Sequence, residues 1–172
     1  MNIVLLGYMG SGKSLIGKKL SKNIGFDFLD LDTYIEKQEK KSISLIFSEK
    51  GEVYFRKKET FYLKELLKST KNSVIALGGG TPCFGDNMQS ILNDDAHKSV
   101  YLQTSLDVLT DRLFNQRNKR PMISHIKSKV LLHDFIRKHL FERSFYYNQS
   151  LYKIQTDHKT VDQIIDEIKT LF

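Results

Sequence analysis

A glycine-rich octapeptide near the start of the chain sets narrow limits on its fold. Residues 7–14 read Gly-Tyr-Met-Gly-Ser-Gly-Lys-Ser and satisfy the pattern G-x-x-x-x-G-K-[ST]. An apolar run, residues 3–6, precedes the octapeptide, and a stretch with helical periodicity, residues 13–23, follows it. The glycines let successive N–H groups point at phosphate oxygens, and the N-terminus of the helix adds a favourable dipole. We therefore expect a loop that binds a nucleoside triphosphate.

Two side chains of the octapeptide suit separate tasks in such a loop. Lys13 can reach the β- and γ-phosphates, and the Ser14 hydroxyl can bind magnesium. The residues expected to bind the nucleotide here are Gly10, Ser11, Gly12, Lys13, Ser14 and Leu15.

Short apolar segments alternate with helix-period segments along the whole chain. We expect five strands, at residues 3–6, 26–29, 74–77, 100–102 and 151–155. We expect helices at residues 13–23, 33–39, 45–50, 54–68, 106–115 and 128–147, and a last helix that opens with a capping box, Thr160 and Gln163. This alternation is typical of a parallel sheet covered on both faces. The sequence therefore predicts one α/β domain over residues 1–172, with three layers in the order αβα.

Composition narrows the classes of protein to which the chain can belong. The 27 Lys and Arg against 20 Asp and Glu give a net charge of +7, which suits a nucleotide or nucleic acid. The basic residues are scattered, without an aromatic-interleaved stripe, so we expect no nucleic-acid binding. Cys83 is the single cysteine, which excludes an intramolecular disulfide and favours the cytoplasm. No apolar run approaches the roughly 20 residues that a membrane span needs, so we expect no membrane partner.

Two acidic residues, Asp30 and Asp32, close the second predicted strand. Because the carboxyl ends of parallel strands line the ligand crevice, both carboxylates are expected beside the phosphate loop. Asp30 could support magnesium, and Asp32 could accept a hydrogen bond or a proton from an acceptor hydroxyl. Alternatively, Asp32 is the N-cap of a helix that begins at Thr33.

The third predicted strand ends in three glycines, residues 78–80, which permit close backbone approach to a small ligand or form a tight turn. Upstream, Phe55-Arg56-x-x-Glu59 opens a helix. Arg56 and Glu59 could form a surface pair at the i,i+3 spacing, or a buried Arg56 could clamp a carboxylate. The spacing is compatible with both.

Four aromatic residues lie near the end of the longest predicted helix: Phe141, Phe145, Tyr146 and Tyr147. We expect this group to pack in the core.

Together these motifs resemble those of the shikimate kinases. The matching series is 7–14, Asp30-x-Asp32, Ile46-Phe47 with Gly51-Glu52, Phe55-Arg56-x-x-Glu59, 78–80, 100–102, Arg112, Arg120-Pro121, and Glu142-Arg143 followed by Tyr146-Tyr147. The resemblance covers nearly the whole chain. It implies a nucleoside monophosphate kinase-like fold with strand order 2-3-1-4-5. It also implies a mobile lid at about residues 116–125 and a shikimate-binding segment at about residues 32–60.

The resemblance also implies roles for individual residues. The positions that match shikimate-binding residues are Asp32, Phe47, Phe55, Arg56, Gly78, Gly79, Gly80 and Arg143. Among these, Arg56 and Arg143 match the pair that grips the carboxylate of shikimate, and Asp32 matches the candidate base.

On the nucleotide side, Ser14 and Asp30 match the residues that hold magnesium, Arg112 matches a residue beside the adenine, and Arg120 matches the lid arginine. The implied catalytic residues are Lys13, Asp32 and Arg120. Two positions have rivals nearby: Arg117 could take the lid role of Arg120, and Arg137 could take the role of Arg143.

The implied activity is transfer of the γ-phosphoryl group of ATP to the 3-hydroxyl of shikimate, with magnesium, in chorismate and aromatic amino acid biosynthesis. We expect a cytoplasmic monomer with shikimate and ATP as its partners. The alternatives are another small kinase of this class, such as a gluconate kinase or a nucleoside monophosphate kinase, and a nucleic-acid-binding module with the same phosphate loop.

Overall fold

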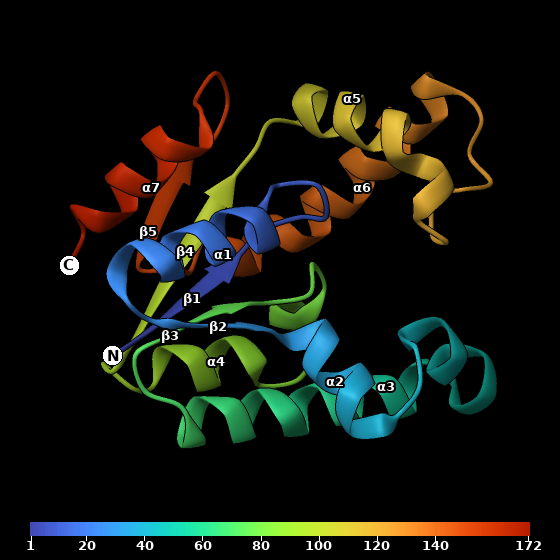
Figure 1. Ribbon diagram of the computed structural model, residues 1–172. Helices are drawn as coiled ribbons and strands as arrows, with labels where there is room; N and C mark the ends of the chain where they lie inside the picture. Colours follow the sequence, from blue (N-terminus) through green and yellow to red (C-terminus); the bar gives the residue numbers. More distant parts are fainter.

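The computed structural model describes the backbone of residues 1–172 and every side chain except that of Lys119. Five parallel strands form one sheet in the order β2-β3-β1-β4-β5 (Figure 1). They are β1 (Asn2–Leu6), β2 (Asp27–Asp30), β3 (Ser73–Ala76), β4 (His97–Gln103) and β5 (Tyr152–Gln155). The α/β class and the predicted strand order are confirmed.

Helices connect the strands and cover the sheet. They are α1 (Lys13–Ile24), α2 (Leu31–Glu39), α3 (Ile43–Ser69), α4 (Asn87–Leu92), α5 (Leu106–Gln116), α6 (Lys129–Tyr147) and α7 (Val161–Lys169), with 3₁₀ turns η1 (Thr81–Cys83) and η2 (Arg117–Lys119). Over the described residues, no helix has the length and apolar character needed to cross a membrane.

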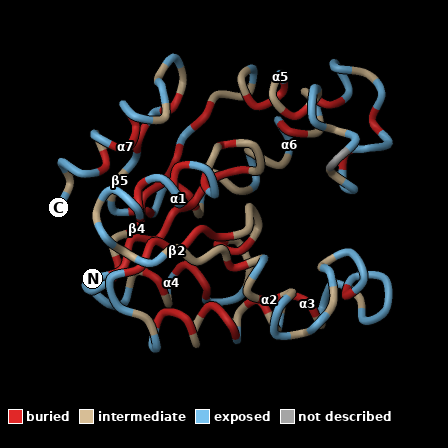
Figure 2. Tube along the Cα trace, viewed as in Figure 1, coloured by how far each residue is buried: buried red, intermediate tan, exposed pale blue. Residues whose placement is uncertain are grey.

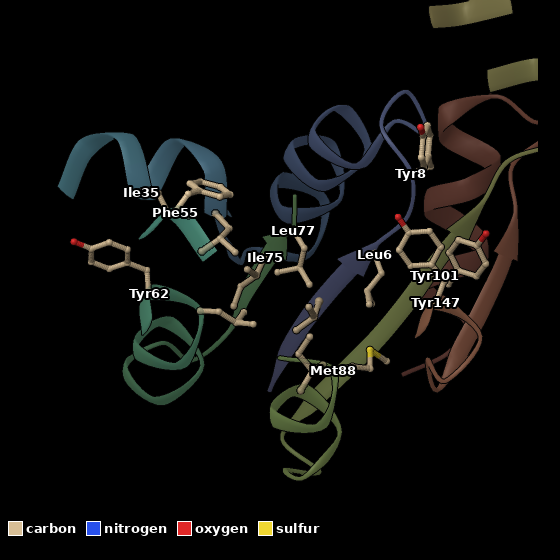
Figure 3. Packing of buried hydrophobic residues seen from close by; sticks show 14 of the residues in the cluster. Leu6, Tyr8, Ile35, Phe55, Tyr62, Ile75, Leu77, Met88, Tyr101 and Tyr147 are labelled. Atoms are coloured by element: carbon tan, nitrogen blue, oxygen red, sulfur yellow. The ribbon is translucent and has the colours of Figure 1, made fainter. Parts of the chain in front are cut away.

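The central strand β1 shows why both faces of the sheet are covered. Its side chains alternate between two buried clusters, because successive residues of a strand point to opposite faces. Ile3 and Leu5 belong to the cluster that contains buried residues of α1 and α7. Val4 and Leu6 belong to the cluster that includes residues of α3, α4 and α6 (Figures 2 and 3). The result is the predicted three-layer arrangement.

The carboxyl ends of the strands point toward a space between two groups of helices, α2 with α3 on one side and α5 with α6 on the other (Figure 1). The phosphate loop leaves β1 at this edge and leads directly into α1. Gly12 caps α1 with φ 97°, a left-handed conformation that glycine adopts without strain. The loop and the helix N-terminus therefore meet where the sequence predicts a phosphate site.

Several local predictions need correction. The helices predicted at 45–50 and 54–68 form one element, α3, which is broken at Gly51 (φ 79°, ψ 172°). The six-residue α4 is not predicted by the sequence pattern, and the segment expected as a lid, at about 116–125, begins with the last residue of α5 and with η2. In the predicted aromatic cluster, Tyr147 is fully buried, whereas Phe141 and Phe145 are 84% and 70% exposed.

The N-cap of α2 also differs from one of the alternatives. The helix begins at Leu31, earlier than the expected Thr33, and its cap is Asp30, whose Oδ1 accepts a hydrogen bond from Thr33 N at 3.3 Å. Asp32 lies in the first turn of the helix instead of capping it. Its side chain is therefore not engaged in capping.

Candidate active site

Two adjoining cavities lie at the carboxyl edge of the sheet. The larger, of about 610 Å³, is lined by the phosphate loop, and the smaller, of about 300 Å³, is lined by parts of α3, the triple glycine and α6. Both cavities are lined by Met9, Asp32, Gly78, Gly79 and Arg120. A ligand in one cavity is therefore next to a ligand in the other.

Every residue that the sequence analysis assigned to the nucleotide, magnesium or shikimate site lines at least one of these cavities. Those on the larger are Gly10, Ser11, Gly12, Lys13, Ser14, Leu15, Asp30, Asp32, Gly78, Gly79, Arg112 and Arg120. Those on the smaller are Asp32, Phe47, Phe55, Arg56, Gly78, Gly79, Gly80, Arg120 and Arg143.

The ammonium group of Lys13 is held by its own loop. Lys13 Nζ donates to the carbonyl oxygens of Gly7 at 2.7 Å and Tyr8 at 3.0 Å. Burial lowers the pKa of Lys13 to about 8, although the carboxylates of Asp32 and Asp30 oppose the shift. The Oγ of Ser11 is buried and has no hydrogen-bond partner among the described residues, so the loop offers a further donor to a phosphate oxygen.

Ser14 and Asp30 bring hard oxygen atoms together on the floor of the larger cavity. Ser14 Oγ donates to Asp30 Oδ2 at 2.7 Å. Among the described residues, no group of three or more His, Cys, Asp or Glu side chains could hold a metal ion. This sparse oxygen set fits magnesium, which is usually bound by one or two protein oxygens together with phosphate oxygens and water.

Asp32 lies between the two cavities and has an unusual environment. Burial raises the pKa of its carboxyl to about 6, with further contributions from the negative charges of Asp30 and Glu59, while Lys13 opposes the shift. A Cβ atom at Gly78 would lie 2.8 Å from Asp32 Oδ1, so only glycine leaves room for the carboxylate. A carboxyl with this pKa can accept a proton close to neutral pH.

Arg56 is mostly buried, and it is paired. Its Nη1 donates to Glu59 Oε2 at 2.8 Å, while Glu59 Oε1 accepts from Thr81 Oγ1 at 2.6 Å. Glu59 is 1% exposed, and the guanidinium lies 3.8 Å from the ring centroid of Phe84. Of the two alternatives left open by the sequence, the i,i+3 pair is observed, but with the Glu59 carboxylate buried instead of on the surface. One guanidinium edge is fixed by Glu59, and the same side chain lines the smaller cavity.

The triple glycine separates the two arginines of the smaller cavity. A Cβ atom at Gly80 would lie 3.2 Å from Arg56 Nη1, and one at Gly79 would lie 3.6 Å from Arg143 Nη1. On the wall of the cavity, the rings of Phe47 and Phe55 have centroids 4.7 Å apart. Two guanidinium groups beside an aromatic wall fit a small, partly apolar carboxylate.

The two rival arginines have other partners. Arg117 Nη1 donates to Phe114 O at 2.8 Å, and its guanidinium lies 4.4 Å from the centroid of the Phe114 ring. Arg137 is exposed and pairs with Asp134 at 3.4 Å. Neither lines the two cavities, so the geometry favours Arg120 and Arg143.

Arg120 and Arg112 approach the larger cavity from α5 and the segment that follows it. Arg120 Nε is buried and has no hydrogen-bond partner among the described residues, and burial lowers the pKa of its guanidinium. Arg112 Nη1 donates to Gly10 O at 3.1 Å, which ties α5 to the phosphate loop. The side chains of Arg112 and Arg120 therefore both line the larger cavity.

Sequence reasoning missed part of both linings. On the larger cavity the missed residues are Met9, Ile16, Leu77, Gln116, Thr156, Lys159, Val161 and Ile164, and on the smaller they are Met9, Ile43 and Met122. Four of these follow the carboxyl end of β5. Because every parallel strand ends at the same edge, that position was a usable signal.

Comparisons with known proteins agree with this geometry. A family model described as shikimate kinase matches residues 9–171. A shikimate kinase of Flavobacterium johnsoniae is 48% identical over 166 residues, covering 96% of this chain and 95% of the relative. A shikimate kinase of Flavobacterium psychrophilum is 45% identical over 171 residues, covering 99% and 98%. This chain belongs to the shikimate kinase family.

Solved structures of the shikimate kinase family share the whole architecture. The crystal structure of a shikimate kinase from Bacteroides thetaiotaomicron matches with a TM-score of 0.90 and 35% identity, covering 99% of this chain and 97% of that one. A shikimate kinase from Acinetobacter baumannii in complex with shikimate matches with a TM-score of 0.86 and 32% identity, covering 99% and 91%. Membership of this family of ATP-dependent kinases makes ATP the co-substrate.

Proposed function

We propose that this chain transfers the γ-phosphoryl group of ATP to the 3-hydroxyl of shikimate, giving shikimate 3-phosphate and ADP. The observation that carries the proposal is the position of Asp32. Its partly buried carboxyl lies between a phosphate loop and a small cavity with two arginines, and its pKa is raised to about 6. A base at that point can meet an acceptor hydroxyl on one side and the γ-phosphate on the other.

On the acceptor side, Arg56 and Arg143 grip the carboxylate of shikimate, and Phe47 and Phe55 pack against its ring. The buried Glu59 supports this role, because it orients Arg56 through the 2.8 Å ion pair. The backbone of residues 78–80 lies close to the acceptor, and Asp32 orients the hydroxyl and takes its proton.

On the nucleotide side, the residues mainly position the phosphates and offset charge, which is most of what phosphoryl transfer requires. Backbone N–H groups of Gly10, Ser11 and Gly12 hold the β-phosphate, and Lys13 neutralises the β- and γ-phosphates. Leu15 lies beside the loop and Arg112 beside the base. Ser14 and Asp30 would hold magnesium, which when bound would offset negative charge on the transferred group.

We further propose that residues 1–172 work as one unit, with a shikimate-binding segment at about 32–60 and a lid at about 116–125 that closes over the phosphates. The lining of both cavities supports this division, since residues from each segment contribute to it. One chain supplies the lining of both cavities, so a monomer suffices for activity. The single cysteine supports a cytoplasmic site of action.

A coupled assay of ADP release with magnesium and ATP tests the proposal. The acceptors compared are shikimate, gluconate and nucleoside monophosphates. We expect stimulation by shikimate alone and a product heavier by one phosphate group. Stimulation by another acceptor would reassign Arg56 and Arg143, and no stimulation by any acceptor would contradict a kinase function.

A further inference from the structure

A buried tyrosine inside the phosphate loop has a role that the loop pattern does not require. The pattern G-x-x-x-x-G-K-[ST] leaves position 8 free, yet Tyr8 is 1% exposed and belongs to the main buried cluster. Its side chain leaves the loop toward α6 (Figure 3). Tyr8 therefore connects the loop with the helix that carries Arg143.

The backbone of Tyr8 is tied to the nucleotide side of the site. Its carbonyl oxygen accepts hydrogen bonds from Lys13 Nζ at 3.0 Å and from Ser11 N at 3.1 Å. A movement of the Lys13 ammonium or of the loop thus changes the position of Tyr8.

The side chain of Tyr8 is tied to the acceptor side. The guanidinium of Arg143 lies 5.3 Å from the centroid of the Tyr8 ring, within the range of a cation–π contact. The hydroxyl of Tyr8 is joined to His139 Nδ1 by a 3.1 Å hydrogen bond, and the Phe135 ring packs edge-on against His139 at 4.3 Å. The phenol ring is therefore fixed at its tip and presents one face to Arg143.

Helix α6 supplies these partners from one face. His139, Arg143 and Tyr147 are spaced by four residues, so they lie one above another along the helix. Tyr147 is fully buried, and its hydroxyl donates to the carbonyl oxygen of Gly79. The same stripe of α6 thus contacts the phosphate loop at Tyr8 and the triple glycine at Gly79.

We propose that Tyr8 is a positioning residue that couples the phosphate loop to Arg143, with His139 holding its ring in place. The inference rests on the proposed function, because it assigns Arg143 to the acceptor. Nucleotide binding orders the loop, the loop fixes Tyr8, and the ring of Tyr8 holds the guanidinium in its binding position. By reciprocity, the acceptor strengthens nucleotide binding by the same factor.

KM measurements on two substitutions of Tyr8 separate the effect of losing the aromatic ring from the effect of losing the hydroxyl. Tyr8→Leu removes the ring, and we expect its shikimate KM to rise between about 2-fold and 30-fold, the range of a cation–π contact. The KM for ATP, measured without saturating shikimate, should change less than about 2-fold, because the backbone contacts remain. Tyr8→Phe keeps the ring and should recover most of the loss. Tyr62→Phe is the matched control, because Tyr62 is a buried tyrosine of α3 whose hydroxyl donates to Glu39 at 2.6 Å.

A double substitution shows whether Tyr8 acts on shikimate binding through Arg143. In an Arg143→Ala chain, Tyr8→Leu should cause no further loss of shikimate affinity, because its partner is already gone. If the rise in the shikimate KM of the double variant equals the product of the rises in the two single variants, the proposal is overturned. An equal rise of the shikimate KM and of the ATP KM measured without saturating shikimate would also overturn it, since that pattern indicates general damage to the loop.

An NMR measurement on the chain without substrate tests the contact between Tyr8 and Arg143 independently of the proposed function. The NMR signal of the Arg143 Nε–H group should carry a ring-current shift in the unsubstituted chain and in Tyr8→Phe, and should lose that shift in Tyr8→Leu. If Tyr8→Leu fails to fold, His139→Gln replaces it, and we expect a broadened or moved Arg143 signal. An Arg143 signal unaffected by these changes would overturn the coupling, whereas absence of shikimate phosphorylation with the shift present would contradict only the proposed function.

Discussion

At the scale of single residues, Asp32 and Lys13 have pKa values shifted close to neutral pH. The pKa of Asp32 rises to about 6, and that of Lys13 falls to about 8. Burial is the main cause in both, because a buried site penalises the charged form of either group. The two groups are charged together only between these values. The pH dependence of activity should therefore report both.

We predict a bell-shaped dependence of kcat/KM for ATP on pH. The value should fall below about pH 6, where Asp32 is protonated and cannot act as a base, and above about pH 8, where Lys13 loses its charge. Bound phosphates stabilise the ammonium, so the alkaline limb of kcat should lie at higher pH than that of kcat/KM. Initial rates between about pH 5 and pH 10 measure both profiles. If kcat/KM fell only near the ordinary pKa of an aspartate carboxyl, the result would contradict the assigned environment of Asp32.

The same carboxyl should lower the stability of the protein at neutral pH. Its pKa is about 6 in the folded chain, against an ordinary value of 3.8 for an aspartate in water, so the folded state favours the protonated form. The stabilisation of the folded state by the protonated Asp32 carboxyl is complete below about pH 4 and is lost as the pH rises through about 6. Asp32→Asn, which stays neutral, should raise the free energy of unfolding at neutral pH by about 2 to 3 kcal/mol. It should also lower kcat by about 10²-fold or more.

Urea unfolding at several pH values measures the stability change of Asp32→Asn. The gain should vanish near pH 4, and the exposed Asp27→Asn serves as the control with no comparable gain. A stability gain that is independent of pH would indicate a cause other than ionisation of Asp32.

At the scale of secondary-structure elements, α3 shows how one glycine shapes the acceptor cavity. Gly51 (φ 79°, ψ 172°) breaks the element between Phe47 on one side and Phe55 and Arg56 on the other. The break turns the chain so that side chains from both halves line the smaller cavity. An L residue in this conformation is strained by about 1 to 3 kcal/mol.

We predict that Gly51→Ala lowers stability by that strain and also raises the KM for shikimate several-fold, because the two halves of α3 shift relative to each other. Gly25→Ala is a matched control. Gly25 also has a positive φ of 70° and, like Gly51, has no atom within 4 Å of the position that a Cβ would take, but it caps α1 away from both cavities. Gly25→Ala should lower the free energy of unfolding by a similar amount and leave the KM values for shikimate and ATP unchanged. Thermal unfolding and initial-rate kinetics measure the two effects, and equal KM changes in both variants would contradict the role of the break.

Helix α6 shows how far element-scale prediction reaches. Its length and boundaries follow from periodicity, but the expectation that its four aromatic residues pack in the core as a group is wrong. Tyr147 is buried, whereas Phe141 and Phe145 lie on the exposed face, because residues four apart share a face and residues two apart do not. An aromatic side chain does not reveal which face of a helix is covered. The short α4 was missed because its six residues are too few to establish a helical period.

At the scale of the whole molecule, the sequence determined much of the fold and less of the assembled site. Alternating strands and helices predicted the α/β class from local pattern alone, whereas the strand order came from the family resemblance. Pairing order depends on contacts between distant segments, which local periodicity does not encode. Thr156 and Lys159, which line the larger cavity, were missed although their place after the carboxyl end of β5 was a usable signal.

Arg120 is the point where the whole-molecule arrangement bears on catalysis. It follows α5, yet it lines the phosphate cavity and the acceptor cavity together. A cation at that junction can stabilise the transferring phosphoryl group, and closure of its segment can exclude water from it. We predict that Arg120→Ala lowers kcat by about 10³-fold, the scale of a phosphate-stabilising arginine, with a much smaller change in the KM for shikimate.

Arg117→Ala is the matched control for Arg120→Ala, three residues away on the same segment. Because Arg117 donates to Phe114 O and lines neither cavity, its removal should lower kcat by less than about 2-fold. Steady-state kinetics with each variant, and a parallel assay of ATP hydrolysis without acceptor, measure the two effects. Comparable losses in both variants would mean that the segment acts through its overall charge. A large loss in Arg120→Ala alone would tie catalysis to one guanidinium at the junction of the two cavities.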